Sequence, residues 1–260
     1  MGRLRYGELH WSREKDVEKG LNQYLELNEN VFNKTMNRFF KKNLEDINGK
    51  KILDYGGGAG YLSVYCAGKG AEVVLVDAEE ASINTAKYYA QKSNVYGNIK
   101  FIQSEVVPVS LKDRSYDIIL VKDVIEHIQE DQKFLHDISE CQKNGGVVHI
   151  STQNKLSLNY LFEGNYQKYI QKNIKWCGWD QTHVRFYTPD SIKKILLNAG
   201  YIPIKWSSVY IVPYDIFSWF FLRKIYVSVS LLRYIDYLLG SIFPFNRFGW
   251  NFIVSAMKIK

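Results

Sequence analysis

The stretch KILDYGGGAG, residues 51–60, decides the fold of this chain. Its first half indicates a short strand, and four glycines fill the next five positions. Glycines permit positive φ angles and let the backbone approach a ligand closely, while the N-terminus of a following helix attracts negative charge. In open α/β sheets, ligands bind beyond the carboxyl ends of the strands, where the first strand-to-helix turn meets them. We therefore predict a ligand site at this glycine loop.

Short β-branched runs and helical stretches alternate on both sides of the loop. Strands are expected at 51–55, 72–77, 99–103, 116–122 and 146–151, and helices at 60–69, 79–92 and 130–143. Ahead of the first strand, 16–46 indicates one or two helices. Alternation of this kind predicts a mainly parallel sheet with helices on both faces, in a doubly wound α/β fold.

The C-terminal third is expected to complete a seven-stranded, Rossmann-like sheet. Residues 155–176 look partly helical, and TPDSIKKILLNAGY predicts a helix capped by Thr188 with Pro189 in its first turn. Strands expected at 201–212 and 249–259 have no full crossover between them, so we predict a closing antiparallel hairpin. The predicted single domain, 1–260, consists of an N-terminal lid with helices (1–48), a core (49–152), an acceptor-side segment (153–212), a hydrophobic helical insertion (213–248) and the last strand (249–260).

Composition sets broad limits on what the chain binds. The net charge of +7 favours an anionic partner or a solvated basic surface, but Lys and Arg form no long run, which weakens a nucleic-acid partner. Cys66, Cys141 and Cys177 are odd in number, widely spaced and free of any C-x-x-C pair, which argues against disulfides and a zinc site. With a charged N-terminus that lacks a signal segment, the expected location is cytoplasmic.

The spacing of the glycines narrows the choice of nucleotide. A dinucleotide site requires G-x-G-x-x-G, but Gly56, Gly58 and Gly60 are spaced G-x-G-x-G, and the position of the third glycine is Tyr61. The Gly-Lys-Ser/Thr of a P-loop is absent as well. Asp77, at the end of the second expected strand, can accept hydrogen bonds from both ribose hydroxyls. A nucleoside with a ribose is therefore favoured over a bound phosphate chain.

These residues resemble the class I S-adenosylmethionine-dependent methyltransferases, whose first motif is an acidic residue, one residue and a G-x-G-x-G loop. The resemblance implies S-adenosyl-L-methionine as cofactor and S-adenosyl-L-homocysteine as product, with the loop against the methionine and ribose portions. The cofactor-binding residues that it implies are Asp54, Gly56, Gly58, Gly60, Asp77, Ala78, Glu105, Val106, Lys122 and Asp123. A loop rich in glycine merely for packing is the plainer alternative.

Further motifs follow in the family's order. FIQSEVV is similar to the exit of strand three, where Glu105 and Val106 would flank the adenine, although Asp is commoner than Glu there. YDIILVKDVIEHI resembles strand four and its sequel in methyltransferases of the ubiquinone-biosynthesis type, and THVRFYTPDSIKKILLNAGY is similar to their segment after strand five. The resemblance covers about 50–212 and 249–259.

Two histidines are candidate catalytic bases. His127 follows strand four at the ligand-binding edge, and His183 lies with Arg185 in a segment that would cover the acceptor. Arg185 could bind an anionic acceptor bidentately. Each has a structural alternative: His127 could fix the turn by bonding the backbone, and Arg185 could pair internally with Asp180 or Glu126.

The N-terminal segment is a candidate lid over the acceptor. Its Tyr6, His10 and Trp11 are expected at the acceptor together with Arg185 and Tyr187, although a tail docked on the surface is an equal alternative. The five histidines are scattered among no ordered carboxylate set. We therefore expect a metal-independent enzyme.

The insertion 213–248 is strongly aromatic. Charged residues interrupt it every eight or nine positions, so it is too short of apolar residues to cross a bilayer. Phe217, Phe221 and Ile225 form a helical stripe, and further apolar side chains point elsewhere. The segment could cover the domain, form a homodimer surface, bind a membrane surface peripherally or be wholly internal.

Together these patterns predict a methyltransferase that methylates an oxygen of a small polar or anionic metabolite, phosphorylated or sugar-like, by in-line transfer with a histidine base. A quinone or lipid-linked acceptor at the membrane surface is the nearest alternative. A non-catalytic nucleic-acid or nucleotide-binding protein and an NAD-dependent redox enzyme are the others, and the missing third glycine disfavours the last.

Overall fold

The computed structural model describes residues 11–174, 176, 180, 182–212 and 229–259. The predictions for Tyr6, His10, Cys177 and the stripe of Phe217, Phe221 and Ile225 lie outside these residues. Within them, Cys66 and Cys141 are buried free thiols.

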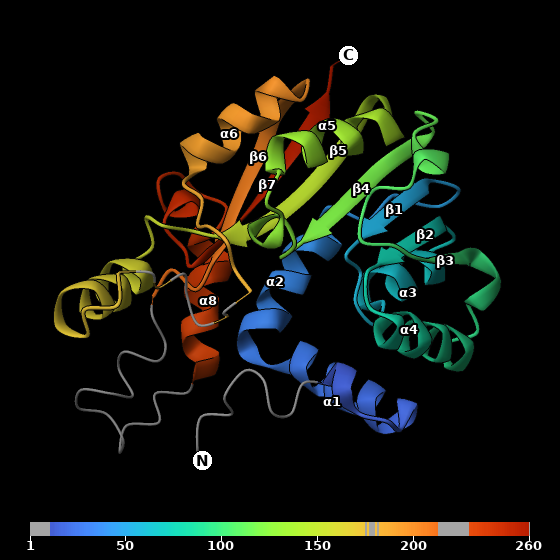
Figure 1. Cartoon of the computed structure of the whole chain (residues 1–260), viewed down its shortest axis with the longest axis horizontal. Coiled ribbons are helices and arrows are strands. Elements are labelled where there is room, and N and C mark those ends of the chain that lie inside the picture. Colours follow the sequence, from blue (N-terminus) through green and yellow to red (C-terminus); the bar gives the residue numbers. More distant parts are fainter. Residues whose placement is uncertain (1–10, 175, 177–179, 181, 213–228, 260) are drawn as a thin grey trace.

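A seven-stranded sheet forms the centre of the molecule (Figure 1). Its strands are β1 (Lys51–Tyr55), β2 (Glu72–Asp77), β3 (Ile99–Gln103), β4 (Tyr116–Lys122), β5 (Gln142–Gln153), β6 (Tyr201–Val209) and β7 (Asn251–Lys258). The strand order is β3-β2-β1-β4-β5-β7-β6, with the first five strands parallel and β7 antiparallel to both neighbours. This confirms the predicted doubly wound sheet with its closing hairpin.

The order of the strands fixes where a ligand can bind. The chain runs outward from β1 through β2 to β3, and then returns to the other side of β1 with β4. The strand order therefore reverses between β1 and β4, and the carboxyl ends of these two strands flank the crevice at which open α/β sheets bind ligands. The glycine loop and His127 both follow strands that end there.

Helices cover both faces of the sheet. The helices are α1 (Val17–Glu29), α2 (Val31–Lys42), α3 (Tyr61–Gly68), α4 (Glu80–Lys92), α5 (Asp131–Cys141), α6 (Pro189–Asn198) and α8 (Val229–Leu239). Of these, α1 and α8 pack mainly on other helices. Single turns of 3-10 helix lie at Trp11–Arg13, Tyr96–Asn98, Val109–Leu111, Ile125–His127 and Phe245–Arg247, and π-helical turns at Tyr160–Gly164 and Tyr166–Ile170. The partly helical character expected for 155–176 is thereby confirmed.

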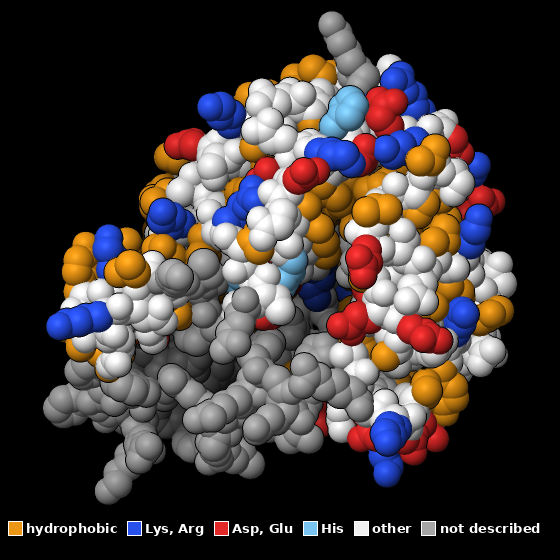
Figure 2. Space-filling view, in the orientation of Figure 1, with side chains coloured by type: hydrophobic (Ala, Val, Ile, Leu, Met, Phe, Trp, Pro, Cys, Tyr) orange, Lys and Arg blue, Asp and Glu red, His pale blue; other side chains and the backbone are white. Residues whose placement is uncertain are grey.

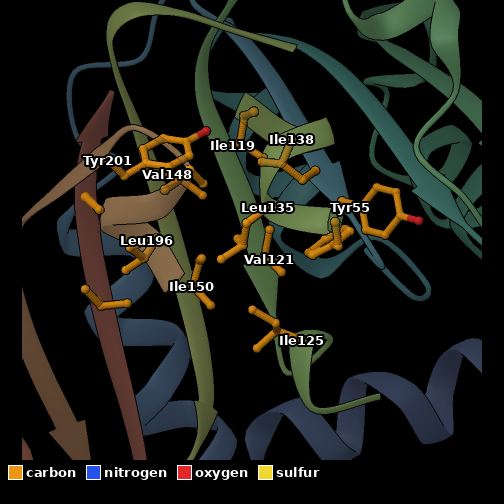
Figure 3. Close-up of a cluster of buried hydrophobic side chains, with 14 of the residues drawn as sticks. Tyr55, Ile119, Val121, Ile125, Leu135, Ile138, Val148, Ile150, Leu196 and Tyr201 are labelled. Atoms are coloured by element: carbon orange, nitrogen blue, oxygen red, sulfur yellow. The ribbon is translucent and has the colours of Figure 1, made fainter. Parts of the chain in front are cut away.

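Alternation along the strands produces two cores. Ile119 and Val121 of β4 point to the face covered by α5 and α6, where Leu135 and Leu196 pack against them (Figure 3). Leu120 points to the opposite face, which α2, α3 and α4 cover. Successive side chains of a strand point to opposite faces, so a strand buried on both sides is apolar throughout. This explains why β4 carries an unbroken apolar run.

Local capping sets the helix boundaries. Asn30 ends α1 and begins α2, because its side chain accepts a hydrogen bond from the backbone N–H of Asn33 at 2.8 Å. Thr188 and Ser191 form a reciprocal capping box at the start of α6, which confirms the predicted cap. The strand expected at 201–212 ends earlier, at Val209, because Tyr210 adopts a φ of 61° and turns its N–H to the Asp236 carboxylate.

The segment that follows β5 exposes apolar side chains to solvent. Several apolar side chains between 156 and 174 are exposed, among them Phe162 at 61%, Tyr169 at 65% and Ile170 at 67%. Among the helices of the described ranges, none combines the length and apolar character required to cross a membrane.

Candidate active site

The glycine loop is pressed against the sheet, and this explains its composition. Gly56, Gly58 and Gly60 have φ angles of 69°, 55° and 83°. A Cβ at Gly56 would lie 2.3 Å from Val124 Cγ2, and a Cβ at Gly57 would lie 2.9 Å from Leu75 Cγ. Side chains at these positions would displace the loop or strain its backbone. The glycines therefore hold the loop against the exits of β2 and β4.

Asp77 connects the loop to β2. Its Oδ2 atom accepts a hydrogen bond from the Gly58 N–H at 2.9 Å, and its Oδ1 atom accepts one from the Glu79 N–H at 3.0 Å. Burial raises the pKa of this carboxyl, against these backbone hydrogen bonds. Each oxygen keeps a second lone pair, so the carboxylate can also accept hydrogen bonds from ribose hydroxyls. Asp77 thus shapes the loop as well as being the predicted ribose ligand.

Asp54 lies beneath the loop. Its carboxylate is 2% exposed and accepts a 2.7 Å hydrogen bond from Ser63 Oγ of α3. Burial raises its pKa to about 6. A Cβ at Gly57 would come within 3.0 Å of this carboxylate, so the loop lies directly against it. The predicted direct contact between Asp54 and the cofactor is therefore revised: Asp54 supports the loop from below.

The predicted adenine-flanking residues occupy the neighbouring strand exits. Glu105 and Val106 are exposed beyond β3, and Tyr55 Oη donates to the Glu105 carbonyl at 3.2 Å. Ala78 is exposed beyond β2, where its carbonyl accepts a 3.3 Å hydrogen bond from Gln103 Nε2. These residues share the carboxyl edge of the sheet with the loop, as a cofactor spanning β1 to β3 would require. Their contact with adenine stays a prediction.

Lys122 and Asp123 end β4. Lys122 is half-buried, and its Nζ donates to Asn37 Oδ1 of α2 at 2.8 Å. Burial lowers the pKa of this ammonium, against the attraction of Asp123 and Asp54. Asp123 has a φ of 54°, and its Oδ1 accepts 2.8 Å hydrogen bonds from Ser151 Oγ and Asn251 Nδ2. Asp123 therefore ties β4 to β5 and β7, whereas Lys122 faces α2.

A hydrogen-bonded chain fixes the ring of His127. Thr182 Oγ1 lies 2.9 Å from His127 Nδ1 and donates its proton to Asp180 Oδ1 at 2.6 Å. A hydroxyl has only one proton, so His127 Nδ1 must donate to Thr182. In the neutral ring, the Nε2 atom then carries the lone pair. Asp180 and Thr182, two residues that the sequence pattern did not single out for this role, therefore fix the orientation of the His127 ring.

His183 and Glu126 complete this group. The rings of His127 and His183 pack edge to face with centroids 4.7 Å apart, and His183 Nε2 lies 4.0 Å from Asp180 Oδ2. Glu126 is 1% exposed and accepts a 2.9 Å hydrogen bond from Thr152 Oγ1. Burial, with the nearby Asp123, raises the pKa of Glu126 well above its ordinary value. Both predicted bases thus share one site with a buried carboxyl.

The same group has the composition of a metal site. One ligand-type atom each from Glu126, His127 and His183 lies within 4.8 Å of the others. Imidazole and carboxylate ligands suit zinc and related divalent cations, so this trio could hold one. The sequence expectation that the histidines stand apart from ordered carboxylates is wrong in this respect. Their separation in the chain hid the cluster, although Glu126 and His127 are adjacent.

Two predicted acceptor residues instead brace the segment that carries His183. Arg185 forms an ion pair with Asp131 and donates to the Gln129 carbonyl. Tyr187 is 3% exposed, and its Oη donates to Asp131 Oδ2 at 2.8 Å. Both side chains are held on Asp131 at the start of α5, which gives Arg185 and Tyr187 a bracing role, and their predicted acceptor contacts stay predictions. The internal pairing anticipated for Arg185 is present, with a different carboxylate.

Trp11 also differs from its prediction. It is 7% exposed and packs on Tyr24 with ring centroids 4.8 Å apart. A Cβ at Gly58 would lie 3.7 Å from Trp11 Cζ2 and 3.6 Å from Tyr24 Oη. The Tyr24 hydroxyl also accepts a 3.3 Å hydrogen bond from the Tyr61 N–H. Trp11 and Tyr24 therefore cover the glycine loop, which is the cofactor side of the site, and Tyr24 carried no motif that would have shown this.

Figure 2 shows that this face of the molecule is hollowed, with histidine and basic side chains visible inside the hollow.

A family model described as a methyltransferase domain matches residues 24–205. The chain belongs to this family. S-adenosylmethionine is the cofactor that the resemblance predicted, and the family match supports it. The matched range contains the glycine loop, Asp77 and the histidine cluster of this methyltransferase.

Curated relatives agree with the family. The methyltransferase is 32% identical over 164 residues to the ubiquinone biosynthesis O-methyltransferase of Rickettsia prowazekii (strain Madrid E), an alignment that covers 62% of each chain. It is also 32% identical over 151 residues to the protein of the same name from Pelagibacter ubique (strain HTCC1062), covering 58% of this chain and 59% of the relative. The chain thus spans less than two thirds of these relatives.

Solved structures share the fold. Geranyl diphosphate C-methyltransferase from Streptomyces coelicolor A3(2) superimposes with a TM-score of 0.61 at 11% identity, covering 99% of this methyltransferase and 90% of that chain. A SAM dependent methyltransferase from Aquifex aeolicus gives 0.56 at 18% identity, covering 95% and 100%. At these identities the likeness establishes the fold.

Proposed function

We propose that this methyltransferase transfers the methyl group of S-adenosylmethionine to an oxygen of a small acceptor with a polar or anionic group. The observation that carries the proposal is the orientation of His127, which the chain from Asp180 through Thr182 holds with its Nε2 lone pair available at the carboxyl edge of β4. Asp77 and the glycine loop, at the same edge, provide the cofactor side.

The reaction follows from this arrangement. The acceptor oxygen attacks the methyl carbon in line with the carbon–sulfur bond, which breaks and leaves its electron pair on sulfur as S-adenosylhomocysteine forms. The acceptor hydroxyl proton passes to His127 Nε2. Positive charge on the ring is stabilised through Thr182 and Asp180, whose own pKa is lowered by the hydrogen bonds from Thr182 despite partial burial.

Two substitutions of His127 test the base directly. His127→Asn keeps a donor near the Nδ1 position for Thr182 but removes Nε2, and His127→Gln places an amide nearer the Nε2 position. We expect S-adenosylhomocysteine formation with a hydroxyl acceptor to fall about 100-fold in both variants, with unchanged affinity for S-adenosylmethionine. Unchanged turnover in His127→Asn would reject the base, because that variant preserves the hydrogen bond and loses only Nε2.

Chelation decides how the cluster of Glu126, His127 and His183 acts. If His127 removes the proton itself, turnover survives extended dialysis against EDTA. If turnover is lost and a divalent cation restores it, the Nε2 lone pair is a metal ligand, and a bound cation that polarises the hydroxyl replaces the base. Metal content of the purified protein, measured by mass spectrometry, supports the distinction without an activity assay.

A quinone or lipid-linked acceptor is the second candidate. It is favoured by the names of the curated relatives and by the exposed apolar side chains between 156 and 174. Co-flotation with vesicles that is lost in Phe162→Ser with Ile170→Ser supports this acceptor class. Absence of flotation, together with methylation of a water-soluble acceptor, favours the polar metabolite.

A further inference from the structure

We propose that the pocket between α2 and α8 binds a phosphate group, and thereby that the acceptor is a phosphate ester or diphosphate; the second step rests on the proposed methyl transfer. The pocket is a cavity of about 400 Å³, which is within the usual range for small-molecule sites. Figure 1 shows α8 beside α2, near the carboxyl end of β4. The residues that line the pocket are Glu29, Lys34, Asn37, Arg38, Lys41, Tyr61, Tyr234 and Tyr237.

Basic side chains dominate this pocket. Lys34, Arg38 and Lys41 recur at helical spacing on one face of α2, while Met36 and Phe40 of the same helix are fully buried. Among the described residues of the lining, Glu29 is the single acid, and it pairs with Lys34 at 2.6 Å. Among the residues described for this chain, no carboxylate lies within ion-pair distance of Arg38 or Lys41. Within the part of the chain that the structure describes, the lining therefore carries two cations whose charge no nearby acid balances.

Tyrosine rings hold these two cations in place. The Arg38 guanidinium carbon lies 3.9 Å from the centre of the Tyr237 ring, and Lys41 Nζ lies 4.5 Å from the centre of the Tyr61 ring. Lys41 also donates to Tyr61 Oη at 2.9 Å. A guanidinium stacked on a ring keeps its edge N–H groups for an anion, and phosphate accepts two such bonds at once. A simple solvated helix face would not fix its cations in this way.

Asn37 connects the pocket to the reaction site. It is 2% exposed, lines the pocket and accepts from Lys122 Nζ at 2.8 Å. Asn37 Nδ2 in turn donates to Asn28 Oδ1 at 2.9 Å, which fixes the orientation of its amide. The bond to Asn37 occupies one of the three Nζ protons of Lys122, and no other acceptor for this ammonium is found among the described residues. Asn37 thus links Lys122, at the end of β4, to the lining of the basic pocket.

Phosphate is the ligand chemistry that these features favour. A carboxylate would use one bidentate contact, whereas the pocket offers a guanidinium, two ammonium groups and tyrosine hydroxyls around a larger volume. A mono- or diphosphate accepts from several of these at once. The phosphate could belong to a soluble metabolite or to a lipid headgroup, and the two sources are separable by experiment.

The test is calorimetry of the full chain with inorganic pyrophosphate. Arg38→Gln combined with Lys41→Gln should weaken pyrophosphate binding at least 10-fold. Lys42→Gln is the matched control, because Lys42 is exposed on the same helix and does not line the pocket. Tyr237→Leu removes the ring beneath Arg38 and one hydroxyl but no cation, so it should weaken binding to a smaller extent. Equal affinity in the wild type and the double variant, or no binding by the wild type, would overturn the proposal.

Two controls separate the possible failures. Asp77→Ala should remove binding of S-adenosylmethionine and leave pyrophosphate affinity intact, so loss of the cofactor site alone does not count against the pocket. Vesicles of phosphatidylglycerol identify the source of the phosphate: sedimentation that the double variant abolishes indicates a headgroup, and sedimentation equal to that with phosphatidylcholine indicates a soluble ester. If the double variant binds phosphatidylglycerol vesicles as well as the wild type does, the headgroup binds outside this pocket.

Discussion

The cofactor side and the acceptor side of the crevice are built in different ways. On the cofactor side, the backbone of residues 55–60 forms the site, and one carboxylate, Asp77, holds it through the Gly58 N–H. On the acceptor side, side chains from three distant segments meet, 126–127, 152 and 180–183, and His127 depends on Thr182 for its orientation. A site formed by backbone depends on consecutive residues, whereas a site formed by converging side chains depends on how distant segments pack. Substitutions in the loop should therefore lower cofactor affinity, and substitutions on the acceptor side should lower turnover.

The largest effect is expected from the loop. Gly56→Ala would place a Cβ 2.3 Å from Val124 Cγ2 at a residue with a φ of 69°, so the loop must move. We expect affinity for S-adenosylmethionine to fall more than about 100-fold, measured by calorimetry. Gly68→Ala is the control, because a Cβ there meets no atom within 4 Å. Equal affinities in the two variants would show that loop geometry does not control binding.

A smaller effect is expected from the residue that orients His127. Thr182→Val removes the hydroxyl while preserving the shape of the side chain. The variant loses the hydroxyl's bonds to both His127 and Asp180. Loss of the bond that orients His127, worth about 1.4 kcal/mol, corresponds to a roughly tenfold lower turnover, with unchanged affinity for S-adenosylmethionine. A tenfold loss of cofactor affinity would show that Thr182 also affects the cofactor side. Unchanged turnover would show that Thr182 is not needed to orient His127.

The dependence of stability on pH provides a test outside the crevice. His149 of β5 is buried, hydrogen-bonded to Ser255 Oγ at 2.8 Å, and burial lowers its pKa to about 4. Between about pH 6.5 and 4 the unfolded chain binds a proton that the folded chain excludes, so this histidine reduces stability as pH falls. The full effect of a pKa lowered from 6.5 to about 4 is on the order of 3 kcal/mol.

His149→Asn isolates this contribution, because an amide can replace Nδ1 in the bond to Ser255. We expect the melting temperature of the wild type to fall more steeply than that of the variant between pH 7 and pH 5. Comparison with the variant cancels other groups, including Asp54, whose raised pKa acts in the opposite direction. If the melting temperatures of the wild type and the variant fall equally between pH 7 and pH 5, His149 is protonated to the same extent in the folded and unfolded chains.

The smallest effect is expected from Tyr187, which braces the segment after β5 against Asp131. Tyr187→Phe removes one hydrogen bond to Asp131 and should lower the free energy of unfolding by about 1 kcal/mol, with the KM for acceptor unchanged. Tyr201→Phe removes a comparable buried hydroxyl, bonded to Gln142 at 2.8 Å and far from the crevice in the sheet order. A raised acceptor KM in Tyr187→Phe alone would return Tyr187 to the acceptor site.

The same contrast explains what the sequence could predict. The bounds of the first four strands followed from β-branched runs between turn residues, and all four are confirmed. The glycine loop could also be predicted, because its backbone adopts positive φ angles at Gly56, Gly58 and Gly60, where glycine is favoured. By contrast, Asn37 approaches Lys122 only through the packing of α2, and no local pattern in α2 indicates it. An internal ion pair of Arg185 was anticipated with Asp180 or Glu126, but its partner is Asp131, at the start of α5.

The most direct test of the account is calorimetric titration of the purified protein with S-adenosylmethionine and NAD, repeated with Asp77→Ala. We expect micromolar affinity for S-adenosylmethionine that the substitution abolishes, and no binding of NAD, because Asp77 holds the Gly58 N–H and is the predicted ligand of the ribose hydroxyls. Binding of NAD, or unchanged binding of S-adenosylmethionine by Asp77→Ala, would contradict the assignment of the glycine loop.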